Sequence, residues 1–172
     1  IDDDKILYKY TPESGTRFGL INAAGEKVLP EEYESLDFSF NNFIIAKGED
    51  NCFVYDKDYR QIFESQGFVI LNKNLIAVKP KNSDNGKWGI VDLNFKFVMP
   101  TKYDRISRLS DNWILLEKKE KMGCISSDFT KVYPCRFINM MVNRMDQPMF
   151  WSKNKWILCS NYMSPNRLEI NT

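Results

Sequence analysis

The stretch that decides the fold is Lys87-Trp88-Gly89-Ile90-Val91, because related stretches recur at a nearly constant interval along the chain. Equivalent five-residue stretches begin at residues 17, 51, 121 and 155, so successive copies lie 34 or 36 residues apart. Each copy has an aromatic or apolar residue at the Trp88 position and another apolar residue two positions later. A period between about 20 and 50 residues indicates a repeat architecture.

Other positions of the repeat keep the same phase. Counted from the Trp88 position, aliphatic residues recur ten residues later, prolines twelve later, aromatic residues fifteen later, and aliphatic residues or methionine eighteen later. In that order they are Val28, Ile62, Val98 and Val132; Pro30, Pro100 and Pro134; Tyr33, Tyr103 and Phe137; and Leu36, Ile70, Ile106 and Met140. The sequence therefore predicts about five 34-residue units within a single domain, 1–172. Their approximate bounds are 17–50, 51–86, 87–120, 121–154, and 155–172 combined with 1–16.

The pattern resembles the WG repeat, which occurs in many bacterial proteins. The matching residues of the third copy are Lys87-Trp88-Gly89-Ile90-Val91-Asp92, then Val98-Met99-Pro100, then Tyr103-Asp104-Arg105-Ile106. The first copy differs by Phe18 in place of Trp, and the fourth and fifth depart further, with Met122 for Trp and Ile157 for Gly. The resemblance extends over nearly the whole chain and implies a β-rich repeat domain. It implies no particular biochemical role.

Each unit is predicted to form three short antiparallel strands, because its apolar segments are rich in β-branched and aromatic residues. In the third copy the strands are expected near residues 88–92, 95–99 and 113–116. Apolar residues do not follow helical spacing over three turns anywhere in the chain. A three-stranded sheet this small cannot bury its faces alone, so successive units must stack. The residues expected inside the stack include Trp88, Trp156, Tyr33 and Tyr103.

The two ends of the chain together match one unit. Residues 155–172 and 1–16 are 18 and 16 residues long, and the second piece contains an isolated strand near residues 6–10. If both ends shared one sheet, two exposed sheet edges would be hidden. We therefore predict an all-β, propeller-like ring of about five units; the alternative is an open β-solenoid array.

Composition restricts the classes of partner. The 24 Lys and Arg residues nearly balance the 23 Asp and Glu residues, so we expect no nucleic-acid partner. No run of 18 apolar residues is present, so we expect no membrane partner. The four cysteines lack metal-ligand spacing and the chain has no histidine, so neither a metal nor another cofactor is expected. Thiols that act as small apolar side chains favour a reducing compartment, here the cytoplasm; the alternative is a secreted or periplasmic location after removal of a signal peptide.

Composition and motifs also restrict the catalytic mechanisms that the chain could use. Absence of histidine excludes Ser-His-Asp and Cys-His catalysis, and no phosphate-binding glycine motif is present. Paired carboxylates among Asp92, Asp104 and Asp111 leave glycoside hydrolysis as the least favoured alternative. We expect that the protein is not an enzyme.

The residues that the repeat explains least lie in the fourth copy, where residues 140–151 hold four of the seven methionines. Met140 occupies the Leu36 position and is assigned to the core. Flexible methionines beside Trp and Arg are typical of adaptable protein-binding surfaces. The equivalent loops are expected at one edge of the array, so the candidate partner-binding residues are Arg144, Met145, Trp151, Arg108 and Trp113.

These residues predict a non-catalytic interaction scaffold that presents a β-repeat surface to another protein. The alternative is a carbohydrate-binding module that uses Trp113 or Trp151 as exposed aromatic platforms. The oligomeric state is left open.

Overall fold

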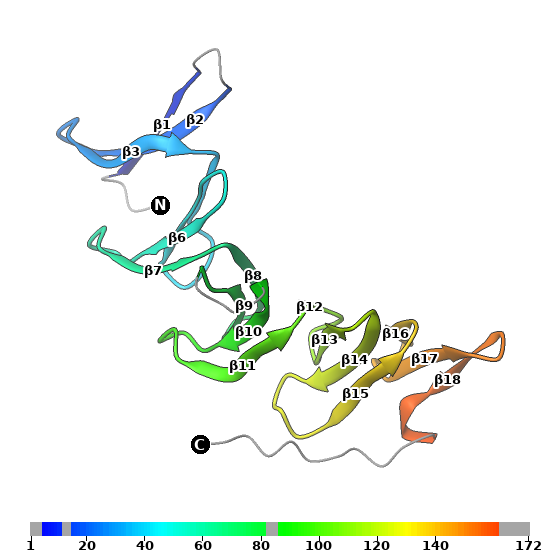
Figure 1. The fold of residues 1–172 in the computed structure, drawn as a ribbon. Helices are drawn as coiled ribbons and strands as arrows, with labels where there is room; N and C mark the ends of the chain where they lie inside the picture. The colour runs from blue at the N-terminus through cyan, green and yellow to red at the C-terminus, as the bar shows by residue number, and fades with distance from the viewer. Residues whose placement is uncertain (1–4, 12–14, 82–85, 162–172) are drawn as a thin grey trace. The chain divides into compact units, whose positions relative to one another are not determined.

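The computed structural model describes residues 5–11, 15–81 and 86–161. It is an all-β structure of small antiparallel sheets, with one short 3₁₀ helix, Cys159–Asn161, among the described residues (Figure 1). The chain divides into two compact units, Ile1–Gly67 and Phe68–Thr172.

The first unit contains a three-stranded sheet, in the order β1-β2-β3, and a four-stranded sheet, in the order β4-β5-β6-β7. The strands are β1 (Lys5–Tyr10), β2 (Arg17–Asn22), β3 (Lys27–Tyr33), β4 (Ser35–Asp37), β5 (Ile44–Lys47), β6 (Cys52–Tyr55) and β7 (Gln61–Ser65). One apolar cluster joins the two sheets, with the side chains of Leu20, Leu29 and Tyr33 on one side and those of Ile44, Ala46 and Tyr55 on the other.

The second unit contains two four-stranded sheets and one three-stranded sheet, in the orders β11-β10-β9-β8, β12-β13-β14-β15 and β16-β17-β18. The strands of the first two sheets are β8 (Gly67–Asn72), β9 (Leu75–Lys79), β10 (Trp88–Val91), β11 (Phe97–Tyr103), β12 (Arg105–Arg108), β13 (Trp113–Lys118), β14 (Lys121–Ser126) and β15 (Val132–Phe137). Those of the third are β16 (Met140–Val142), β17 (Pro148–Ser152) and β18 (Lys155–Leu158). Two further apolar clusters each join neighbouring sheets, so stacking of successive sheets is confirmed within this unit.

The sheets are offset from the sequence units, and the complete ones have four strands where three were predicted. The extra strand carries the aliphatic marker eighteen residues along, which is Leu36 in the short strand β4, Ile70 in the six-residue strand β8 and Ile106 in the short strand β12. In each complete sheet, the third strand of one sequence unit pairs with the first strand of the next, as β9 does with β10. β4 and β12 have only three and four residues with one apolar marker each, which gives too little periodicity for these two strands to be recognised.

The described strands nearest the two ends of the chain lie in different sheets. The strand predicted near residues 6–10 is β1, which pairs with β2, whereas β18 pairs with β17. The second strand expected over residues 167–170 lies outside the described residues. The described strands of the two ends therefore do not share the sheet on which the ring was predicted.

The glycine that directly follows the Trp88 position lies where the backbone of the next strand comes closest to it. The pairing of β14 with β15 shifts register between Met122 and Cys124, at Gly123. A Cβ atom added to Gly123 would lie 2.4 Å from the carbonyl oxygen of Tyr133. The equivalent Cβ at Gly89 would lie 2.8 Å from the Met99 carbonyl oxygen. Both positions therefore require glycine because another backbone occupies the space of a side chain.

The turn after each first strand is also repeated. An Asn or Asp side-chain oxygen accepts two backbone N–H groups of the turn in three copies, at Asn22, Asp56 and Asp92. Three residues after this position the backbone has positive φ in these three turns and in the equivalent Ser126 turn of the fourth copy, at Gly25, Tyr59, Phe95 and Phe129. Only the first of these is glycine, so side-chain capping and packing hold the other three turns in a conformation that L-residues disfavour.

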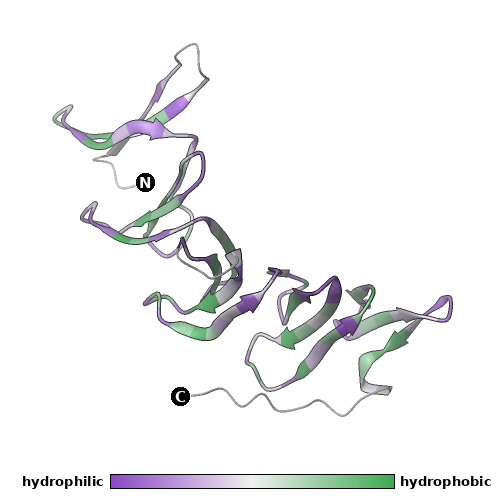
Figure 2. Cartoon of the chain, viewed as in Figure 1, coloured by the Kyte–Doolittle hydropathy of each residue, from purple (hydrophilic) through white to green (hydrophobic). Residues whose placement is uncertain are grey.

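Burial confirms part of the predicted interior. Tyr33 and Tyr103 are buried, whereas Trp88 is half-buried and packs against the edge of a cluster. Trp156 is also half-buried, and its ring contacts Trp151. Figure 2 shows hydrophilic residues at the tip of the β17–β18 hairpin and hydrophobic residues along β18. Among the described residues no helix is long and apolar enough to span a membrane.

Buried tyrosines make the fold sensitive to alkali. Burial raises the pKa of Tyr103 to about 12, above its ordinary value of 10.0, and burial also raises the pKa of Tyr33, which hydrogen-bonds to Tyr55. A folded-state pKa above the unfolded one gives stability that is complete below pH 10 and lost as the pH rises toward 12. We expect Tyr103 alone to account for a loss of roughly 3 kcal/mol over that range. Urea unfolding at a series of pH values should show this loss, and Tyr103→Phe should make it shallower; an unchanged slope would contradict the assignment.

Candidate functional site

A polar hollow of about 480 Å³ lies between the last two sheets of the second unit. It is bordered by three connections: the β12–β13 loop (109–112), the β14–β15 turn (127–131) and the β16–β17 loop (143–147). We call these three connections and the hollow the loop surface. The lining residues are Asn112, Trp113, Ser126, Ser127, Asp128, Thr130, Lys131, Tyr133, Met145, Asp146, Gln147, Pro148 and Ser160.

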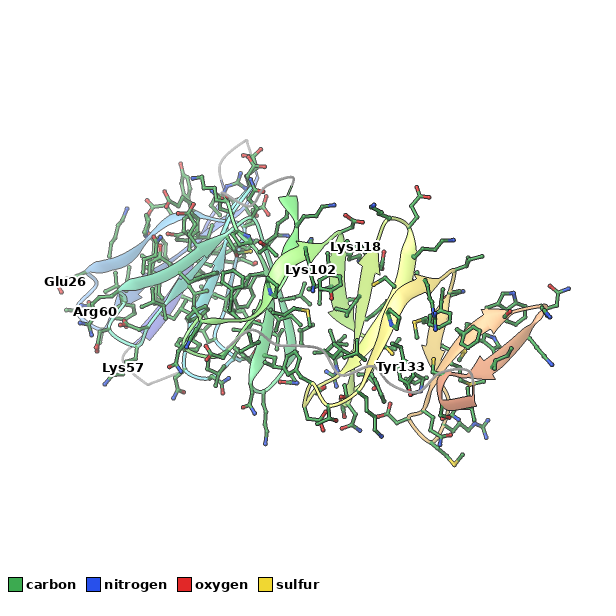
Figure 3. The ribbon with its side chains drawn as sticks, turned by 60° about the horizontal axis from the view of Figure 1, so that its bottom comes forward. Glu26, Lys57, Arg60, Lys102, Lys118 and Tyr133 are labelled. Carbon is green, nitrogen blue, oxygen red and sulfur yellow. The ribbon has the colours of Figure 1, made fainter. Side chains whose placement is uncertain are left out.

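Two aromatic side chains form part of the apolar lining of the hollow. Trp113, at the start of β13, packs against Tyr133 of β15 with ring centres 5.8 Å apart and planes tilted by 41°. The indole N–H of Trp113 donates to the carbonyl oxygen of Asp146 at 2.9 Å. Both aromatic residues belong to the cluster that joins the two sheets, so this part of the hollow is continuous with the core. Figure 3 shows Tyr133 on β15, at the end of the strand near the β14–β15 turn.

Hydrogen bonds connect the three connections to one another. The side-chain amide of Asn112 donates to the carboxylate of Asp146 at 2.7 Å, which joins the first and third. The backbone N–H of Ser127 donates to the carbonyl oxygen of Asn112 at 2.9 Å, and its hydroxyl donates to that of Asp111 at 3.0 Å. The prediction that equivalent loops meet at one edge is therefore confirmed for the β12–β13 and β16–β17 loops of the second unit.

The β14–β15 turn holds a carboxylate in its ionised form. Asp128 accepts from the Ser126 hydroxyl at 2.5 Å and from the Thr130 hydroxyl at 2.8 Å. The backbone N–H of Thr130 donates to the same oxygen at 3.0 Å. These hydrogen bonds lower the pKa of Asp128 to about 2, and the bond from the Ser126 hydroxyl has the largest effect. At neutral pH the hollow thus has a fixed negative charge on one wall, and the Lys131 side chain is another of its lining groups.

The β16–β17 loop projects a methionine beside the hollow. The side-chain oxygen of Asn143 accepts from the backbone N–H groups of Met145 and Gln147, both at 2.9 Å. Asp146 has a positive φ of 57°, which completes the turn. Met145 is left 74% exposed, the largest exposed fraction among the large apolar side chains of the described residues.

The structure places the five predicted partner-binding residues unequally. Met145 and Trp113 both line the hollow, and Arg144 is exposed in the same loop as Met145. Arg108 forms an ion pair with Asp111, which precedes the hollow residue Asn112. Trp151 lies elsewhere, on β17, paired with Trp156 of β18.

The expectation that Trp113 is an exposed platform is wrong. Only 7% of its surface is accessible, because its ring packs on Tyr133 and its N–H is bonded to the Asp146 carbonyl. A residue that directly follows a loop in the sequence can be the first residue of the next strand, and its side chain can then point toward the core. Trp151, in contrast, is 41% exposed.

The carboxylates considered for catalysis have structural partners. Asp92 accepts two backbone N–H groups of its own turn at 2.9 Å. Asp104 forms an ion pair with Lys87 and accepts the Lys119 backbone N–H at 2.6 Å; Lys87 lowers its pKa. Asp111 pairs with Arg108. Among the described residues no group of three or more His, Cys, Asp or Glu residues is placed to hold a metal ion.

Sequence reasoning missed the hydroxyl-rich wall of the hollow. The signal was a departure from the repeat: Ser126 stands where the first three copies have Asn22, Asp56 and Asp92, and in the fourth copy a carboxylate lies two residues further on, at Asp128. Phasing the copies on this turn would have identified the fourth as different.

The comparisons with known proteins agree with the repeat. A family model described as WG containing repeat matches residues 88–121, which is the third copy. No curated protein matches the chain. The matched segment contains the Gly89 crossing and the Tyr103 core position, whose structural reasons are given above. Residues 88–121 therefore match the WG repeat, as the pattern of the third copy predicts.

Proposed function

We propose that this chain is a non-catalytic binding module that holds a segment of another protein at the loop surface. The observation that carries the proposal is Met145, 74% exposed at the border of a hollow lined by Trp113, Tyr133 and the ionised Asp128. An exposed flexible apolar side chain beside a concave polar site is typical of a protein contact with one anchoring pocket. The volume, about 480 Å³, falls within the range of ligand-binding sites.

The hollow favours a partner segment with a basic or amide side chain. Two carboxylates, Asp128 and Asp146, and one ammonium group, Lys131, are among its lining groups. A donor side chain of the partner would bond to the carboxylates while its aliphatic part packs beside Met145. Arg144 and Arg108 lie outside the hollow and would contact the surrounding part of the partner.

We propose that the repeats form an open array. The described strands of the two ends lie in different sheets, so the strand sharing on which a ring was predicted has no support. Small-angle scattering should fit an elongated particle; a compact disc would favour the ring.

The test is site-specific photo-crosslinking. A photoreactive amino acid at Met145 should give one discrete adduct in extracts of the native host, whereas the same group at Phe97, which is 45% exposed in the same unit, should not. With the identified partner purified, Met145→Glu should weaken binding about 30-fold or more, as expected for an anchor residue, and Phe97→Glu should leave it unchanged. Equal adducts at both positions, or an unchanged affinity of Met145→Glu, would contradict the proposal.

A second candidate is carbohydrate binding, favoured by the hydroxyl and amide groups that surround the Trp113–Tyr133 pair. Screening a panel of neutral oligosaccharides by thermal shift distinguishes carbohydrate binding from protein binding. A melting shift that persists in Met145→Glu would favour a sugar ligand in the hollow over a protein at its border.

A further inference from the structure

Acidic and basic residues are divided unequally between the two compact units. Residues 1–67 contain 7 Lys and Arg residues against 14 Asp and Glu residues, which gives a net charge of −7. Residues 68–172 contain 17 against 9, which gives a net charge of +8. The near-neutral charge of the whole chain is therefore the sum of an acidic unit and a basic unit. The expectation of no nucleic-acid partner was based on that sum, so it does not extend to the second unit by itself.

Most basic residues of the second unit gather at one end of its sheets. They lie beside the start of β10, at the junction of β11 and β12, at the end of β15, and at the tips of the β13–β14 and β17–β18 hairpins. We call this end of the sheets the lysine edge. Its basic residues are Lys87, Lys102, Arg105, Lys118, Lys119, Lys121, Arg136, Lys153 and Lys155, and the acidic residues of the same segments are Asp104, Glu117 and Glu120.

Strand pairing places these segments at the same end. Lys118 and Lys121 form the last pair of the β13–β14 ladder, and Ser152 and Lys155 form the last pair of the β17–β18 ladder. The first residue of β10, Trp88, pairs with the last residue of β11. In the same way, the start of β14 pairs with the end of β15.

Contacts join the lysine edge of one sheet to that of the next. The carboxylate of Asp104 forms an ion pair with Lys87, at the start of β10. The same carboxylate accepts the backbone N–H of Lys119, at the tip of the β13–β14 hairpin, at 2.6 Å. The basic residues of these two sheets therefore belong to one surface.

The environment of Cys135 gives independent support for this grouping. Burial raises the pKa of the Cys135 thiol to about 11, and the positive charges of Lys118 and Lys102 both oppose that rise. The two lysines come from different sheets, yet both must lie near the same thiol to have this effect. Figure 3 shows Lys102 and Lys118 close together.

The repeat also explains why the lysines form a row. Lys87, Lys121 and Lys155 are the first residues of three successive sequence units and lie 34 residues apart. Lys119 and Lys153 are also 34 residues apart, and both have positive φ in the turn of their hairpin. Because packed sheets lie about 10 Å apart, equivalent lysines should recur at about that interval along the edge.

The composition of the lysine edge favours a phosphate backbone over an acidic protein. Protein–protein interfaces are depleted in lysine and enriched in aromatic residues, methionine and arginine. Seven of the nine basic residues of the edge are lysines. Every nucleotide carries a phosphate charge, so a row of lysines meets phosphates in any register. A protein segment would instead need carboxylates at matching intervals.

We propose that the lysine edge of the second unit binds the phosphate backbone of a nucleic acid without sequence preference. Each ammonium group that neutralises a phosphate releases condensed counter-ions, and this release supplies the free energy of binding. The site is independent of the proposed protein contact. β13 runs from Trp113 at the loop surface to Lys118 at the lysine edge, so the two surfaces lie at opposite ends of the same sheet.

The experiment titrates the full chain into a fluorescent DNA duplex of mixed sequence, about 20 base pairs long, at a series of salt concentrations. Fluorescence anisotropy should give a Kd on the order of 10⁻⁵ M. The logarithm of the association constant should fall against the logarithm of the salt concentration with a slope of about −4, which corresponds to about four phosphate contacts. A second duplex of unrelated sequence should bind equally well.

The variant that tests the edge combines Lys121→Gln with Lys155→Gln. Both side chains are exposed, so the fold and the melting temperature should be retained. Binding at low salt should weaken about tenfold or more, and the slope should fall to about −2. The matched control combines Lys57→Gln with Lys96→Gln, which are exposed turn residues outside the lysine edge. It changes the net charge by the same amount and should bind like the wild type.

Three results would overturn the proposal. The first is no binding of the duplex at low salt, and the second is equal weakening in the edge variant and in the control. The third is binding to vesicles that contain phosphatidylserine, or to poly-glutamate, in the absence of binding to the duplex, which would identify an anionic membrane or an acidic protein as the partner. Crosslinking from Met145 should persist in the edge variant, so this test and that of the loop surface fail independently.

Discussion

Replacing Gly123 with alanine is expected to lower the free energy of unfolding by about 3 kcal/mol. The added Cβ would lie 2.4 Å from the Tyr133 carbonyl oxygen and 2.7 Å from the Cys135 nitrogen, and both are backbone atoms of β15. Neither can move without breaking the pairing of β14 with β15, which already shifts register at this point. Chemical denaturation monitored by tryptophan fluorescence would measure the change.

The matched control is the equivalent glycine of the first copy. At Gly19 the nearest atoms belong to the flexible side chain of Tyr8, 2.7 Å from the added Cβ, and that ring can rotate away. Gly19→Ala should therefore lower stability by only about 1 kcal/mol. If the two substitutions had equal effects, intrinsic strand propensity would explain them better than backbone crowding.

Replacing Trp113 with alanine is expected to lower the free energy of unfolding by about 4 kcal/mol and to abolish binding at the loop surface. The substitution removes a buried ring that packs on Tyr133, and it leaves the Asp146 carbonyl without its indole donor. The cavity would open directly into the hollow, so the β16–β17 loop would lose its anchor to β13. Denaturation and partner titration on the same samples would measure both effects.

Trp113→Phe separates packing from the hydrogen bond. Phenylalanine keeps the contact with Tyr133 but cannot donate to Asp146, so the loss should fall to between about 1 and 2 kcal/mol. Binding should weaken because the loop that carries Met145 and Asp146 would lose one of the hydrogen bonds that position it. Retention of full affinity in Trp113→Phe would show that the loop is positioned without this bond.

The sequence predicted some buried positions correctly because the same type of residue recurs there in several copies. Tyr33 and Tyr103 were predicted to be buried because they recur in phase, and both are. The sheets themselves were harder to predict, because pairing of β9 with β10 crosses the boundary at which the sequence repeats. A period gives the length of the unit but not the point at which one sheet ends and the next begins.

The candidate site was recognised only in part. Met145 was found because methionines cluster in its segment, whereas Asp128 was missed because its role depends on two hydroxyl groups that the turn brings together. The inward orientation of Trp113 depends on hydrogen bonding between residues 33 positions apart. Contacts between residues this far apart, such as that of Trp113 with Asp146, arise from stacking of sheets, and a short window of consecutive residues does not contain them.

Packing restricted to neighbours has a consequence for how such a chain changes length. Each apolar cluster of the fold joins only two successive sheets, so a sheet is specified by the one before it and the one after it. Duplication of a gene segment that encodes one period would insert a sheet whose two faces already match its new neighbours. A chain built in this way can therefore lengthen or shorten by whole periods without redesigning any interior.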